Sequence, residues 1–133
     1  MNRKNLHLLL SSIIVVLAGL AYGGYPTGFI PYFFGFEVEA LGLKQILRAV
    51  MGIYLGVGIF WLIGCYKKTY WKAATLSNIL FMGGISLGRI VSMLFDGVSI
   101  QFTIALLLEL LFFVWGCFNL KVYQYSLYIL NNR

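Results

Sequence analysis

The sequence is poor in the residues that soluble proteins use to cover their surfaces. Only 11% of the 133 residues are charged, four of them are acidic, and there is a single histidine. A soluble domain carries about 25% charged residues, so this deficit argues against an ordinary soluble fold. The net charge of +6 comes from basic residues scattered between apolar runs. Without a continuous basic face, we expect no nucleic-acid partner.

The patterns of common catalytic, metal and cofactor sites are also missing. The two cysteines, Cys65 and Cys117, and the distant His7 make no metal-ligand pattern. His7 is also far along the chain from the acids, which leaves no serine–histidine–acid set. No phosphate loop, dinucleotide fingerprint or haem motif occurs. We therefore expect no metal and no cofactor, and the sequence does not favour an enzyme.

Long apolar runs are what the sequence does have. Hydrophobic residues make up 61% of the chain, and the mean hydropathy is +0.88. A membrane-spanning helix needs about 20 apolar residues, and four segments meet this length: about 6–23, 43–64, 73–95 and 100–120. They lack the alternation of barrel strands. The sequence predicts a single all-α domain over 1–133, an integral membrane four-helix bundle.

The distribution of charge predicts the orientation of these spans. One side of the predicted membrane domain holds basic residues without any acid: Arg3, Lys4, Lys67, Lys68, Lys72, Lys121 and Arg133. The positive-inside rule places that side, with both termini, in the cytoplasm, and the chain in the inner membrane. The alternative is a cleaved signal peptide, with Gly19-Leu20-Ala21 as a small-residue cleavage site.

The connection between the first two spans, residues 24–42, is rich in aromatic residues. Pro26 and Pro31 are expected to prevent a continuous helix through its first half. The aromatic rings suit the headgroup layer of a membrane. This outer segment is therefore either an interfacial belt or a lid over the predicted bundle.

Two glycine pairs have the spacing of close helix contacts. Gly52 and Gly56 lie four residues apart on the second span, and Gly84 and Gly88 do so on the third. This spacing allows helix backbones to approach each other. We expect both pairs to lie in helix–helix interfaces.

Charged residues inside the spans mark a candidate site. Arg89 lies about 10 Å deeper than Asp96, and Glu109 about 13 Å below Ile100, by the helical rise. A lone charge at this depth costs about 3 kcal/mol or more, which an opposite charge offsets. The sequence predicts a central pair of Arg89 with Glu109. Arg48 would join it from above, with Asp96, Glu37 and Glu39 nearer the outer surface.

Two roles for this polar cluster stay open. It is either a staple that fixes helix register or an outward-facing pocket for an anionic headgroup, a carboxylate or another polar ligand. A non-enzymatic membrane module with such a pocket is the leading hypothesis, and its partners are the bilayer, a lipid or small polar ligand, another membrane protein or a second copy. The alternatives are a small transporter, an accessory subunit of a redox or transport complex, or an enzyme acting on a lipid or quinone.

Three stretches resemble a known family. They are "FGFEVEALGLKQILRAVMGIYLGVGIFWLIG", "GGISLGRIVSMLFDG" and "LLLELLF". They are similar to the domain of unknown function 4345 family, small membrane proteins with four predicted spans, from about Phe34 to Glu109. The resemblance implies that the recurrent polar residues of the family are Arg48, Tyr54, Arg89, Asp96 and Glu109. It implies no activity, because none is established for the family.

Overall fold

The computed structural model describes residues 3–131, and the described chain contains helices and no strand. In chain order the elements are η1 (Arg3–Asn5), α1 (Leu6–Gly23), α2 (Pro26–Phe34), α3 (Leu41–Tyr66), α4 (Lys68–Phe95) and α5 (Ile100–Asn131). Four of these helices are long and apolar enough to cross a membrane. The protein is thus all-α and membrane-embedded, as the sequence predicts; Arg133 lies outside the described residues.

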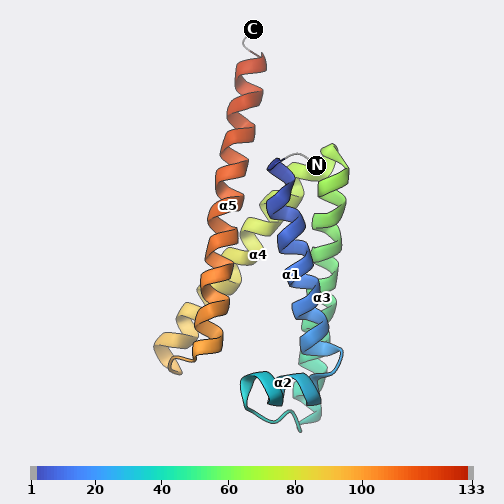
Figure 1. The fold of residues 1–133 in the computed structure, drawn as a ribbon, viewed down its shortest axis with the longest axis vertical. Helices are drawn as coiled ribbons and strands as arrows, with labels where there is room; N and C mark the ends of the chain where they lie inside the picture. The colour runs from blue at the N-terminus through green and yellow to red at the C-terminus, as the bar shows by residue number, and fades with distance from the viewer. Residues whose placement is uncertain (1–2, 132–133) are drawn as a thin grey trace.

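The four long helices are arranged as two antiparallel pairs. Figure 1 shows α1 lying along α3, while α4 and α5 form a hairpin. The pairs meet where α3 turns into α4 and diverge toward the other end, where the short α2 lies across α1 and α3. That end is called the α2 end below. The divergence leaves the α4–α5 turn apart from α2.

The core lies where the two pairs meet. Its buried side chains come from all four long helices: Leu8, Val15, Trp61, Trp71, Ala74, Met82 and Phe112. Trp61 is completely buried, and its indole nitrogen donates a hydrogen bond to the Ser77 hydroxyl at 2.9 Å. This bond satisfies the buried N–H donor of Trp61. Because Trp61 lies on α3 and Ser77 on α4, it also links the two helices.

Two helix boundaries differ from the spans expected from the sequence. The third long helix begins at Lys68 rather than near residue 73, so the basic and aromatic residues after Tyr66 form its first turns. The fourth continues to Asn131, well beyond residue 120. In both cases the hydropathy of the sequence indicated only the apolar part of the helix. The helix itself is longer, because its backbone hydrogen bonds continue through polar residues.

The expectation that two prolines would keep residues 26–34 from forming a helix was wrong. Pro26 occupies the first turn of α2, where its fixed φ suits a helix and its missing N–H has no partner to lose. Pro31 lies inside the helix and removes one hydrogen bond. Gly35, with φ of 77°, then ends α2 in the left-handed conformation that glycine adopts easily.

The expected glycine interfaces were also wrong. A Cβ atom added at Gly52, Gly56, Gly84 or Gly88 would meet nothing within 4 Å. The close contacts occur at other glycines instead. A Cβ at Gly19 would lie 2.8 Å from the Tyr54 Cβ, and one at Gly58 would lie 2.6 Å from a Val16 methyl carbon. The spacing of glycines in the sequence did not distinguish those that contact another helix from those that do not, because both stand among apolar residues.

Replacing Gly58 by alanine should destabilise the protein, whereas Gly56→Ala should not. Alanine favours a helix over glycine by up to about 1 kcal/mol at either site, but at Gly58 its methyl group collides with Val16. We expect Gly58→Ala to lower the free energy of unfolding in detergent by about 1–3 kcal/mol. Equal stability of the two variants would contradict the α1–α3 contact.

Candidate functional site

Arg89 and Glu109 form an ion pair between α4 and α5. The guanidinium Nε donates to both carboxylate oxygens of Glu109, at 2.8 and 2.9 Å. The side chains are 16% and 14% exposed, respectively. The turn that joins the helices contains Gly97 at φ of 105°, which glycine adopts without a Cβ clash. This turn brings α5 back along α4 and places Glu109 opposite Arg89.

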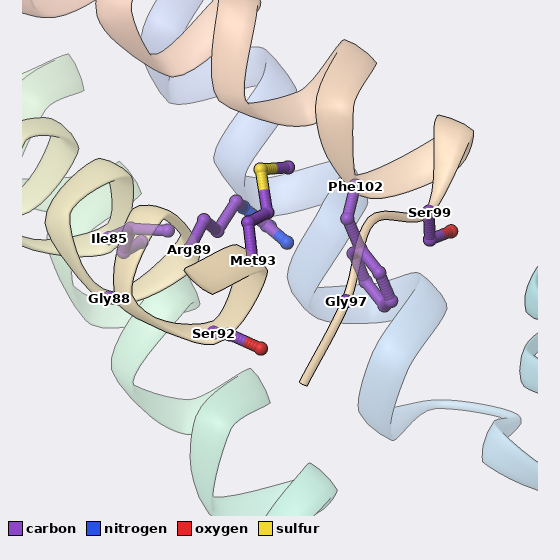
Figure 2. Close-up of a pocket in the computed structure, with 8 residues that line it drawn as sticks. All are labelled: Ile85, Gly88, Arg89, Ser92, Met93, Gly97, Ser99 and Phe102. Carbon is purple, nitrogen blue, oxygen red and sulfur yellow. The ribbon is translucent and has the colours of Figure 1, made fainter. Parts of the chain in front are cut away.

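Two phenyl rings extend the site from the ion pair toward α2. The Arg89 guanidinium carbon lies 5.3 Å from the centre of the Phe102 ring, within the range of a cation–π contact. Phe102 in turn stacks on Phe34 of α2, with ring centres 5.0 Å apart. Figure 2 shows Arg89 reaching from α4 past Met93 toward Phe102. The aromatic α2 segment therefore contacts the charged site through one ring.

Three cavities meet at Arg89. The first, of about 410 Å³, lies along α4 and the α4–α5 turn; Gly88, Ser92, Met93 and Phe102 are among its lining residues (Figure 2). A second, of about 240 Å³, lies between Arg89, Phe102 and the segment formed by α2 and the start of α3. The third, of about 110 Å³, is lined by both Arg89 and Glu109 between the four long helices. Arg89 is thus accessible from several sides.

Two tyrosines complete the innermost cavity. Tyr22 of α1 and Tyr54 of α3 both line it together with Arg89 and Glu109. Their ring centres are 6.0 Å apart, and Tyr54 also contacts Phe81 at 5.2 Å. Tyr54 belongs to the predicted set, whereas Tyr22 was not singled out in the sequence. An aromatic residue directly before the last residue of an apolar span is a weak signal on its own.

The structure does not bring Arg48 into this cluster. Arg48 is exposed, and within residues 3–131 it forms no ion pair. The neighbouring positions Leu47 and Met51 of α3 face Gly23 of α1. One residue turns a helix by about 100°, so Arg48 points away from α1. The face of α3 that Arg48 shares with Gly52 and Gly56, which was expected to turn inward, is exposed.

The three acids near the α2 end also lie outside the cluster. Asp96 is exposed and accepts a hydrogen bond of 2.8 Å from the Ser92 hydroxyl one turn back. Glu37 and Glu39 flank Val38 in an extended segment and are exposed, whereas Val38 is buried. Alternation along an extended backbone turns both carboxylates outward. The structure therefore leaves all three acids exposed and apart from Arg89.

A second polar cluster, at the end opposite α2, was missed in the sequence. His7 is fully buried, and its Nδ1 lies 2.9 Å from the Lys4 carbonyl oxygen and 2.8 Å from Asn119 Nδ2. The Lys4 ammonium lies over the rings of Trp71 and Tyr123, at 5.1 and 5.0 Å. These contacts join α1, α4 and α5 and pack this end closed. The available signal in the sequence was a polar residue, His7 or Asn119, at the end of each of two apolar spans.

The described residues offer no ready metal site. Within that part of the chain, no three side chains of histidine, cysteine, aspartate or glutamate gather closely enough to hold a metal ion. The chemistry available at Arg89 is hydrogen-bond donation beside a carboxylate. This arrangement suits the binding of a polar group.

A double-mutant cycle should measure coupling between Arg89 and Glu109. Each single alanine substitution leaves the other charge in a membrane interior, and we expect a loss of about 1–3 kcal/mol in the free energy of unfolding. The double variant should lose less than the sum of the two, because no unpaired charge remains. Arg48→Ala is the matched control and should change stability little. Additive losses in detergent unfolding experiments would exclude an energetically coupled pair.

The comparison with known families identifies the chain. Its sequence matches the family described as Domain of unknown function (DUF4345) over residues 4–120. No curated protein and no solved structure matches it. The match covers all but the extremities of the chain and confirms the resemblance carried by the stretches around Arg48, Arg89 and Glu109. This protein belongs to the domain of unknown function 4345 family.

Proposed function

We propose that this chain is a non-enzymatic membrane module that binds the polar head of an amphiphilic ligand beside Arg89 and Glu109. One observation carries the proposal: Arg89 lines three cavities while a single one of its nitrogens is used by Glu109. A residue that served only as a staple would be expected to be enclosed by its neighbours. Intramembrane charges that face a cavity are typical of binding sites.

The lining of the cavities supports an amphiphile rather than a fully polar solute. Beside Arg89, the largest of the three presents Ile85, Met93 and Phe102 together with the hydroxyls of Ser92 and Ser99. Its volume of about 410 Å³ falls in the range of small-molecule sites, about 300–1,000 Å³. A ligand with an apolar body and one polar head suits such a surface.

The closed end supports binding over transport. His7, Asn119 and Lys4 join the helices at the end opposite α2, so the pocket would open at one end only. A transporter would need a path past these contacts. In the proposed topology, the termini are cytoplasmic, the protein lies in the inner membrane, and the pocket opens on the outer side.

Filling the largest of the three cavities at Arg89 should abolish ligand binding. A phenylalanine at Gly88 meets no protein atom close to its Cβ and projects into the cavity. The matched control is Gly84→Phe, one turn away on α4, where the Cβ is equally unobstructed and the residue does not line the cavity. Both should fold with unchanged thermal stability. After extraction in polymer nanodiscs, mass spectrometry should find a co-purified molecule with wild type and Gly84→Phe, and at least about tenfold less with Gly88→Phe.

The absence of any co-purified molecule from wild type, or its equal retention by both variants, would count against a pocket at Gly88. Retention by neither variant would show that added bulk on α4 acts through the fold rather than through the cavity.

Reporter fusions test the proposed topology. Green fluorescent protein at the C-terminus should fluoresce, because it folds in the cytoplasm, and alkaline phosphatase at the same position should be inactive. The reverse pattern would overturn the assignment by the positive-inside rule.

A further inference from the structure

Arg89 carries more hydrogen-bond donors than Glu109 accepts. A guanidinium has five N–H groups, one on Nε and four on the terminal nitrogens. Both hydrogen bonds that join Arg89 to Glu109 use Nε. The Tyr22 hydroxyl lies close enough to the guanidinium to accept one hydrogen bond. The other terminal N–H groups remain for an acceptor outside these contacts, and they lie where the three cavities meet.

The charge of the site is already balanced. Arg89 and Glu109 are the charged residues among those that line the three cavities. Arg48, Glu37, Glu39 and Asp96 are exposed and stand outside them. An anionic head would bring a second negative charge beside Glu109, and that charge would have no partner in a medium that penalises unpaired ions. A neutral acceptor could use the free N–H groups without this penalty.

We infer that the ligand of the proposed pocket is an uncharged amphiphile whose ester or carbonyl oxygen accepts hydrogen bonds from the terminal nitrogens of Arg89. The inference rests on the proposed function and narrows its ligand class. The apolar body of the ligand lies along Ile85, Met93 and Phe102 in the largest of the three cavities at Arg89. Glu109 acts as a positioning residue: it holds the guanidinium through Nε and cancels its charge.

Three oleyl compounds distinguish the effect of a carbonyl acceptor on binding from the effect of a negative charge. Monooleoylglycerol carries an ester carbonyl, 1-O-oleylglycerol replaces the ester by an ether, and oleate carries a negative charge. Binding is measured by native mass spectrometry and by thermal shift, at pH 8 in dodecyl maltoside, a detergent without a carbonyl group. We expect the ester to bind at least about tenfold more tightly than the ether, because a hydrogen bond to a charged donor is lost. Oleate should also bind more weakly than the ester.

The variant Glu109→Gln should reverse the preference. Without the carboxylate, the Arg89 charge is unbalanced, and an anion becomes the better partner. Oleate should then bind more tightly than monooleoylglycerol. Arg48→Gln removes an exposed charge from the same half of the molecule and should leave the wild-type order unchanged. A role of Glu109 in stability alone would weaken all three compounds together.

Two outcomes would overturn the inference in wild type: equal binding of ester and ether, or tightest binding of oleate. If Glu109→Gln fails to fold, the order of affinities of the three compounds for the wild-type protein decides whether the ligand is uncharged. The experiments distinguish a wrong ligand class from the absence of a pocket. If Gly88→Phe blocks binding while oleate binds most tightly to wild type, the pocket stands and the uncharged ligand is wrong.

Discussion

The ion pair between Arg89 and Glu109 is the interaction on which the arrangement of this molecule depends. Each charge alone would cost about 3 kcal/mol or more in hydrocarbon. Nε of Arg89 lies within 2.9 Å of both carboxylate oxygens, and this contact joins α4 to α5. In this arrangement Phe102 lies beside the guanidinium and Phe34 lies on Phe102. The charged pair is thereby connected to the α2 segment through Phe102.

The two ends of the helix assembly have different characters. At one end, His7, Asn119 and the Lys4–Trp71 contact join three helices around a buried polar cluster. At the other, the α1–α3 and α4–α5 pairs diverge (Figure 1). The three cavities lie around Arg89. An arginine at the junction of a packed and an open region keeps its pairing partner and still presents free donors. In this position Arg89 can stabilise the helix pair and bind a ligand at the same time.

Aromatic rings connect the open region to the core. Phe102 contacts Phe34, Phe34 contacts Tyr22, Tyr22 contacts Tyr54, and Tyr54 contacts Phe81, with ring centres 5.0–6.0 Å apart. The chain of contacts passes through α5, α2, α1, α3 and α4. It gives α2 a packing partner in spite of the hydrogen bond that Pro31 removes. Ring packing also supplies walls for the cavities beside Arg89.

The sequence by itself determined the class of the protein, the four long apolar helices and the two opposite charges that were expected to pair inside the membrane. Length and hydropathy report these features directly, and the cost of an unpaired charge in lipid made Arg89 and Glu109 the expected partners. The directions of Arg48, Glu37, Glu39 and Asp96, and the glycines that lie in contacts, were decided by the tertiary structure alone. In a membrane helix the lipid-facing and core-facing residues are both apolar, so hydropathy does not distinguish the two faces. Only the packing of α1 on α3 and of α4 on α5 selects which face of each helix turns inward.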